Sequence, residues 1–102
     1  MPKSIAVLLL LAVGSALAHA TTTLPGNSAL GEKLYQDRCA ACHASQFGSD
    51  GSVIFVRKGR HVHSIKGLYR QVGSCNTQLA KMLSGSQQQY IVKYLDDRYY
   101  KF

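Results

Sequence analysis

Residues 39–43 read CAACH, so that two thiols, Cys39 and Cys42, stand three positions apart and the imidazole of His43 follows at once. This C-x-x-C-H spacing is the attachment signature of a c-type haem. On one helical turn both thiols can reach the vinyl groups along one edge of a haem, and the imidazole can turn toward the iron, for which histidine is a standard ligand. The pattern predicts thioether links at Cys39 and Cys42 and an iron ligand at His43.

Two other kinds of site use a C-x-x-C pair, namely redox dithiols and zinc sites. The dithiol requires a βαβ context, and no strand pattern precedes Cys39. A structural zinc site requires four ligands, usually from a second spaced pair, whereas this chain adds only Cys75 and scattered histidines. The sequence therefore favours haem attachment over both alternatives.

The N-terminal segment 1–20 has the pattern of a secretory signal peptide. It has a basic start at Lys3, an apolar stretch over residues 5–13 and a small-residue exit that ends at Ala20. The apolar stretch is too short to span a bilayer, so cleavage would leave residues 21–102 without a membrane span. Haem is attached to such thiols outside the cytoplasm, and the bacterial character of the signal predicts a periplasmic protein.

Three helices are expected to position the haem motif, which makes the chain an all-α protein. The first begins at Asn27 or Ser28 and runs into the motif. The second begins at the cap Ser64 and ends at Gly73. The third begins at a capping box over residues 86–89. Its expected buried stripe comprises Tyr90, Ile91, Tyr94, Leu95 and Tyr99.

The segments between these helices are expected to be loops. Residues 46–52 contain two glycines and an aspartate and predict a turn-rich loop. The apolar run 53–56 is too short to assign by periodicity, and we expect it to line the haem pocket. Residues 76–85 are expected to form the loop before the last helix.

The chain is basic, with a formal net charge of +7 from 12 Lys and Arg against 5 Asp and Glu. Such a surface attracts acidic partners and raises the rate of encounter with them at low salt. Because an exported chain seldom meets nucleic acid, acidic redox proteins are the expected partners. The densest basic patch is residues 57–63, which would be a docking face, a clamp on haem propionates or only a solvated loop.

This order of parts resembles that of the class I cytochromes c. The residues that carry the resemblance are Gly31 and Tyr35 before the C-x-x-C-H motif, and Tyr94 and Leu95 on the last helix. In that family a glycine and an aromatic residue of the first helix cross an aromatic residue of the last. The resemblance implies a single domain over residues 21–102, with three main helices around one covalently attached haem, and an electron carrier rather than an enzyme.

One departure from the family concerns the proximal histidine. Members of the family place a proline shortly after the haem motif, and its carbonyl orients the imidazole. Here no proline follows Pro25. A hydrogen-bond partner that fixes the ring of His43 is still expected, because such partners set the tautomer of ligating histidines.

The resemblance places the sixth iron ligand in the loop before the last helix, where Met82 is the only methionine left after cleavage. Thioether sulfur raises the reduction potential, which suits an electron carrier. Cys75 is the second candidate, since an unpaired thiol in an oxidising compartment is open to oxidation unless it is buried or bound. His63, His61 and an open position are the remaining alternatives.

Two other functions are compatible with the same motif. In a haem-based ligand-binding module or enzyme, the distal position would be open or labile and His61 and His63 would act on a small molecule. In a fixed electron-transfer subunit of a larger complex, the aromatic segment 99–102 would hold the chain in place. The sequence contains no sign of a substrate pocket, so the mobile electron carrier is the favoured function.

Overall fold

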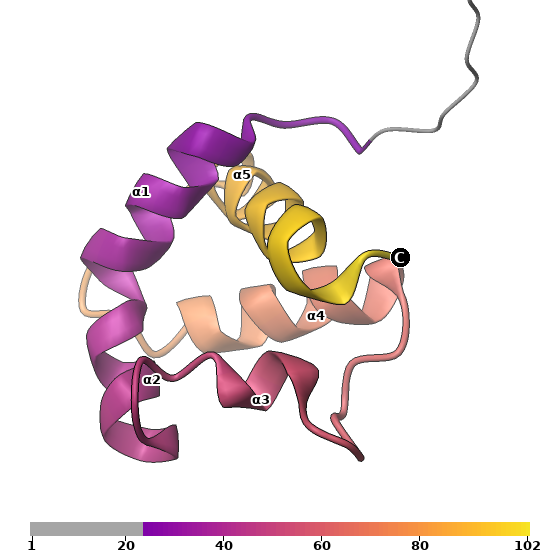
Figure 1. The fold of residues 1–102 in the computed structure, drawn as a ribbon. Coiled ribbons are helices and arrows are strands. Elements are labelled where there is room, and N and C mark those ends of the chain that lie inside the picture. Colours follow the sequence, from indigo (N-terminus) through magenta and orange to yellow (C-terminus); the bar gives the residue numbers. More distant parts are fainter. Residues whose placement is uncertain (1–23) are drawn as a thin grey trace, which may run out of the picture.

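The computed structural model describes residues 24–102, and the predicted signal peptide 1–20 lies outside the described residues. Within residues 24–102 the chain forms helices and no strands, which confirms the all-α class. In chain order the helices are α1 (Ser28–Arg38), α2 (Ala40–Phe47), α3 (Val53–Val56), α4 (Ile65–Asn76), α5 (Gly85–Leu95) and the π-helical turn η1 (Asp96–Tyr100) (Figure 1). None of the helices in this part of the chain is long and apolar enough to cross a membrane.

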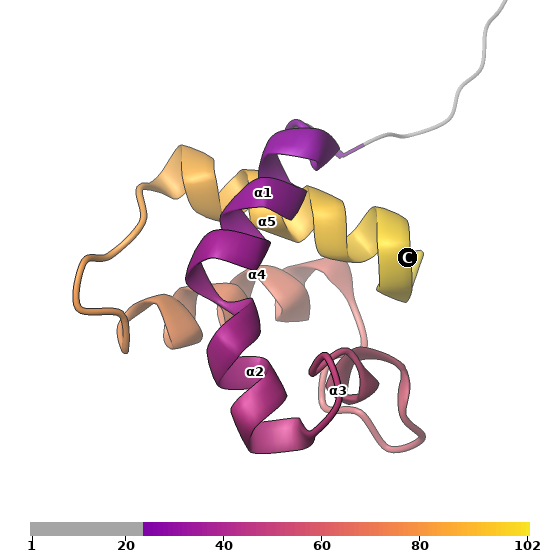
Figure 2. The same cartoon turned by 60° about the vertical axis from the view of Figure 1, so that its left-hand side comes forward.

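Helix α1 begins where the sequence predicts. The side chain of Asn27 accepts a hydrogen bond of 3.0 Å from the backbone N–H of Leu30, which satisfies one of the free donors of the first turn. Gly31 and Tyr35 are the buried residues of α1. Both face α5, and the crossing of α1 over α5 is seen in Figure 2. The crossing therefore fixes the direction in which α1 leads into the C-x-x-C-H motif.

Helices α1 and α2 are separated by one residue, Cys39, whose backbone (φ −126°, ψ −34°) departs from helical geometry. The hydrogen bonding nevertheless continues across the break. The N–H of Cys39 donates to the carbonyl of Tyr35 (2.8 Å), and the N–H of His43 donates to the carbonyl of Cys39 (3.2 Å). The motif thus forms one hydrogen-bonded helical turn at a bend between two helices.

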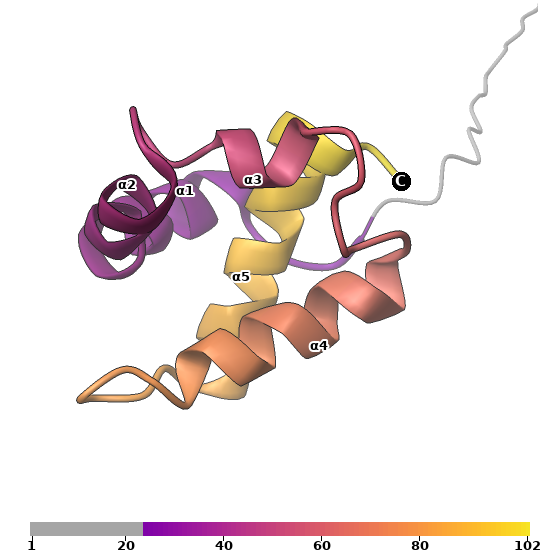
Figure 3. The same cartoon turned by 90° about the horizontal axis from the view of Figure 1, so that it is seen from below.

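The loop after α2 is shorter than predicted, because α2 continues through Phe47. Asp50 closes the loop: its carboxylate accepts hydrogen bonds from the N–H and the hydroxyl of Ser52 at 2.9 and 2.7 Å. The run 53–56 that follows is the short helix α3, which lies beside η1 at the end of α5 (Figure 3). The loop therefore brings α3 back to the end of the chain.

Helix α4 is capped by Ser64 as predicted, with its hydroxyl accepting from the N–H of Gly67 at 3.0 Å. The predicted end at Gly73 is wrong, because α4 continues to Asn76. Gly73 keeps a negative φ there. Helix α4 passes beside α5, against which it packs (Figure 3).

Helix α5 begins two residues earlier than predicted, because Ser84 rather than Ser86 is its cap. Ser84 and Gln87 form a reciprocal capping box: the hydroxyl accepts from the N–H of Gln87 at 3.1 Å, and the Gln87 side chain accepts from the N–H of Ser84 at 2.9 Å. Of the predicted stripe, Ile91, Tyr94 and Leu95 are buried.

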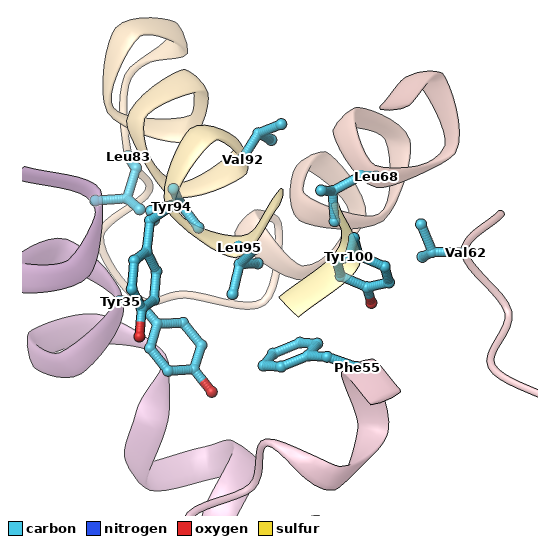
Figure 4. Packing of buried hydrophobic residues seen from close by; sticks show 10 residues of the cluster. Tyr35, Phe55, Val62, Leu68, Leu83, Val92, Tyr94, Leu95 and Tyr100 are labelled. Carbon is cyan, nitrogen blue, oxygen red and sulfur yellow. The ribbon is translucent and has the colours of Figure 1, made fainter. Parts of the chain in front are cut away.

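The hydrophobic core is built around α5 (Figure 4). Val92 is fully buried although it was not part of the predicted stripe, so both sides of α5 are covered. Leu68 of α4, at 1% exposed, lies on one side, and Tyr35 of α1 on the other. The buried members of the core are Tyr35, Phe55, Val62, Leu68, Leu83, Ile91, Val92, Tyr94, Leu95 and Tyr100.

Candidate functional site

The two thiols of the motif stand at the bend between α1 and α2. Cys39 is half-buried and Cys42 is exposed, and both are free. Burial raises the pKa of the Cys39 thiol, the charge of a Cys75 thiolate would raise it further, and Arg38 lowers it. Cys39 is therefore a protonated thiol at neutral pH. The bend presents two unpaired thiols and one imidazole on a single turn.

The imidazole of His43 lies in a wall of aromatic rings. The distance between ring centroids is 5.3 Å to Phe55, 5.6 Å to Phe47 and 5.7 Å to Tyr35. Burial lowers the pKa of His43, so the ring is held in its neutral form. Neutral imidazole is the form that binds metals. Of its two ring nitrogens, Nδ1 is buried without a hydrogen-bond partner.

The backbone of His43 is held from the other side by Gly51. A Cβ added to Gly51 would lie 2.6 Å from both the carbonyl carbon and the Cβ of His43, so only glycine permits this approach. Gly51 also has φ +83°, a conformation that other residues rarely adopt. The loop after α2 therefore fixes the position from which the imidazole projects.

Tyr35 links the motif to the crossing of α1 and α5. Its ring is 4% exposed and lies 5.9 Å from the ring of Tyr94 and 5.8 Å from that of Phe55. The structure thus brings together Gly31, Tyr35 and Tyr94, the residues on which the resemblance rests. The Tyr35 hydroxyl is buried without a partner, and burial raises its pKa well above the ordinary range, so it stays protonated. In Figure 4 it points away from α5, to the side of Phe55.

Met82 lies in the loop between α4 and α5 and is 62% exposed. The loop itself is fixed at its base. The side-chain amide of Asn76 accepts from the N–H of Leu83 at 2.7 Å and donates to the carbonyl of Leu83 at 3.2 Å. Arg38 donates to the carbonyl of Lys81. The structure therefore gathers residues 39–43 on one turn, whereas Met82 is presented on a separate, anchored loop.

The other candidates for the sixth ligand are exposed as well. Cys75 lies on α4, where the side chain of Gln71 donates to its sulfur at 3.3 Å. His61 and His63 are exposed in the segment before α4. Within residues 24–102 no group of three or more histidine, cysteine, aspartate or glutamate side chains is arranged to hold a metal ion.

The basic patch 57–63 is divided between two roles. Arg57 and Lys58 are exposed. Arg60 instead packs into the fold, where it donates to the carbonyl of Phe55 at 2.9 Å and places its guanidinium 4.8 Å from the ring centre of Tyr100 and 5.5 Å from that of Phe102. Arg57 and Lys58 thus present their charge to solvent, whereas Arg60 connects α3 to the rings of Tyr100 and Phe102.

Two residues around the motif were not predicted from the sequence. Gly51 lies against the backbone of His43, and Asn76 holds the loop that carries Met82, whereas Phe55, which lies beside His43, belongs to the run 53–56 that is expected to line the haem pocket. The turn-forming composition of residues 48–51 is a sequence signal for Gly51. A second glycine in a tight turn often marks a left-handed conformation or a close approach of another segment. No local pattern marks Asn76.

Comparison with protein-family models, with curated proteins and with solved structures finds no match to this chain.

Proposed function

We propose that the chain is a periplasmic electron carrier of the class I cytochrome c type, with one haem c joined to Cys39 and Cys42 and with His43 as an iron ligand. The observation that carries the proposal is the C-x-x-C-H motif on a single hydrogen-bonded turn, with both thiols free and the imidazole neutral. The residues fit the group, because thioether formation requires unpaired thiols and iron ligation requires an unprotonated ring nitrogen.

The chain's own residues would serve a haem in three ways. Cys39 and Cys42 supply the covalent links, and His43 supplies an iron ligand from an aromatic wall that keeps water from its buried side. Gly51 fixes the backbone from which the imidazole projects. A bound haem would supply one-electron chemistry at its iron, which no side chain of the site offers.

The arrangement of the main helices supports the family assignment. Helices α1, α4 and α5 correspond to the three main helices expected around the haem, and among the described helices the most extensive contact is that of α1 with α5. The crossing uses a glycine and an aromatic residue of α1 against an aromatic residue of α5, as in the class I cytochromes c.

The expected partners are acidic redox proteins. The net charge of +7 provides long-range attraction, and the exposed Arg57 and Lys58 provide positive charge beside α3. Because exposed charges are screened by salt, the rate of electron transfer to an acidic partner should fall as ionic strength rises. The chain has no need of a substrate pocket in this role.

The first experiment is mass measurement of the processed protein from a host that carries out cytochrome maturation. We expect the mass of residues 21–102 plus one haem. The variant in which Cys39 and Cys42 are both replaced by serine should lack this addition, whereas Cys75→Ser should keep it. A wild-type protein without the addition would contradict the proposal and favour a dithiol.

The 62% exposure of Met82 favours a second candidate function, a haem-based ligand-binding module in which the sixth position is labile. Absorption spectroscopy separates the two functions. A carrier ligated by Met82 should show a thioether-to-iron charge-transfer band when oxidised, lose it in Met82→Ala and bind no carbon monoxide when reduced. Loss of the band in Cys75→Ser instead would assign the ligand to Cys75. Rapid binding of carbon monoxide by the reduced wild type would support the ligand-binding module.

A further inference from the structure

Two buried polar atoms near the haem motif have no hydrogen-bond partner, Nδ1 of His43 and the hydroxyl of Tyr35. They are the only such side-chain atoms recorded within residues 24–102. Leaving a buried donor or acceptor unpaired costs about 1–3 kcal/mol. Buried polar groups in proteins are therefore nearly always paired, and exceptions often mark a functional site.

The two atoms belong to rings that are in contact. The rings of His43 and Tyr35 lie 5.7 Å apart between centroids, edge to face at 75°. The other rings beside His43 are those of Phe47 and Phe55, which carry no polar atom. Among the aromatic neighbours of His43, Tyr35 alone can therefore form a hydrogen bond.

The same reasoning applies from the side of Tyr35. Its neighbours are His43, Phe55 and Tyr94. The ring of Tyr94 packs edge to face on Tyr99, with 6.2 Å between centroids, and makes no ring contact with His43. The backbone carbonyl of Phe55 already accepts from Arg60 at 2.9 Å. Among the aromatic neighbours of Tyr35, only His43 has a buried polar side-chain atom without a partner.

The chemistry of the pair is complementary when the iron is bound. A neutral imidazole that gives one nitrogen to a metal keeps its hydrogen on the other, so iron at Nε2 makes Nδ1 a donor. A phenol oxygen can accept that hydrogen. In class I cytochromes c, the acceptor for the proximal imidazole is the backbone carbonyl of a proline shortly after the motif. This chain has no proline after Pro25.

We propose that the hydroxyl of Tyr35 accepts the Nδ1 hydrogen of His43 in the haem-bound protein and is a positioning residue for the iron ligand. This inference rests on the proposed function. Neither atom is hydrogen-bonded in this structure, so the two rings must reorient when the haem binds for the bond to form. The acceptor fixes the tautomer and plane of the imidazole and makes it a stronger electron donor to the iron. The oxidised iron is then favoured, and the reduction potential is lower than without the bond.

The test uses the haem-bound protein and the variant Tyr35→Phe. In the reduced wild type, nuclear magnetic resonance of ¹⁵N-labelled histidine should show a slowly exchanging hydrogen on Nδ1 of His43. In Tyr35→Phe the exchange should be roughly tenfold faster, the factor expected for loss of one hydrogen bond, and the reduction potential should rise. Tyr94→Phe is the control, because it removes the hydroxyl of another ring that contacts Tyr35 but is not among the rings in contact with His43, and it should change neither quantity.

The results separate the possible failures. A haem-bound Tyr35→Phe with unchanged exchange and unchanged potential would overturn the role of Tyr35 and leave the proposed function intact. An equal rise in potential for Tyr94→Phe would also overturn it. If Tyr35→Phe fails to fold, rapid exchange of the Nδ1 hydrogen in the wild type is sufficient to reject the bond. A wild type without attached haem contradicts the proposed function itself, and this inference with it.

Discussion

Gly31 of α1 lies directly against the carbonyl of Tyr90 of α5. A Cβ on Gly31 would overlap the carbonyl oxygen and would lie 2.6 Å from the carbonyl carbon of Tyr90 and 2.8 Å from the Cβ of Tyr94. Backbone meets backbone at this point, so no side-chain rotation can make room. The crossing that orients the motif therefore depends on the absence of a single methyl group.

Gly31→Ala should destabilise the protein by about 3 kcal/mol, because α1 and α5 must move apart to accept the methyl group. Gly73→Ala is the matched control in α4, where the nearest atom to an added Cβ would be 3.7 Å away. That substitution should stabilise the protein by up to about 1 kcal/mol through higher helix propensity. Denaturant unfolding of both variants measures the difference, and equal effects would contradict this account of the crossing.

Gly51→Ala should lower both stability and the yield of attached haem. Alanine at position 51 must adopt a left-handed backbone conformation, which costs roughly 1–2 kcal/mol. Its Cβ would also lie 2.6 Å from the carbonyl carbon of His43 and clash with it. Gly59→Ala isolates the first effect, because Gly59 has nearly the same φ (+82°) and nothing within 4 Å. Unfolding free energy and the haem-to-protein absorbance ratio are the measurements. The account is wrong if Gly59→Ala lowers the haem ratio as much as Gly51→Ala.

Asn76→Ala should open the loop that carries Met82. The substitution leaves the buried N–H of Leu83 without its acceptor, at a cost of about 1–3 kcal/mol. Gln88→Ala is the control, since Gln88 donates to the carbonyls of Leu83, at 3.2 Å, and Ser84, at 3.3 Å, and accepts nothing from the N–H of Leu83. Native-state hydrogen exchange should show loss of protection at the amide of Leu83 in Asn76→Ala alone. Retained protection there would mean that Asn76 does not hold the loop.

Stability should decline at alkaline pH because of the buried tyrosines. Burial, with a hydrogen bond to Tyr99, raises the pKa of Tyr94 from 10.0 to about 12, and burial also raises the pKa of Tyr35 and Tyr100. The unfolded chain therefore loses these protons first, so stability is complete below pH 10 and falls as pH rises from 10 through 12. Denaturant midpoints over this range should fall less steeply in Tyr94→Phe, and parallel curves would refute the assignment.

Local signals explain what could be predicted of the fold. The caps of α1, predicted at Asn27 or Ser28 and found at Asn27, and of α4 at Ser64 are predictable because each cap bonds a backbone N–H of its own helix, a contact that needs no tertiary structure. The predicted cap of α5, Ser86, is wrong because Ser84 and Ser86 both precede a glutamine by three residues, and this local pattern does not distinguish them. Asn76 hydrogen-bonds the N–H and the carbonyl of Leu83, the residue before Ser84, and this contact places the start of α5 at Ser84. No sequence pattern contains that tertiary contact.

The candidate site also has one part that local sequence predicts and one part that depends on tertiary contacts. The C-x-x-C-H motif is local, and a single turn presents all of its reactive groups. The surroundings of His43 come from three separate segments, with Tyr35 before the motif and Gly51 and Phe55 after it. Their meeting depends on the bend at Cys39 and on the positive φ of Gly51, neither of which periodicity can report.

The aromatic cluster allows unfolding to be followed by the intrinsic fluorescence of its tyrosines. The chain contains six tyrosines and no tryptophan. Ring contacts connect three of the tyrosines: Tyr94 contacts both Tyr35 and Tyr99. Tyr35 and Tyr99 also contact Phe55, whose ring lies beside that of His43. A porphyrin beside His43 would quench their fluorescence by energy transfer. Return of tyrosine emission on unfolding would then report, without any label, when α5 separates from the motif.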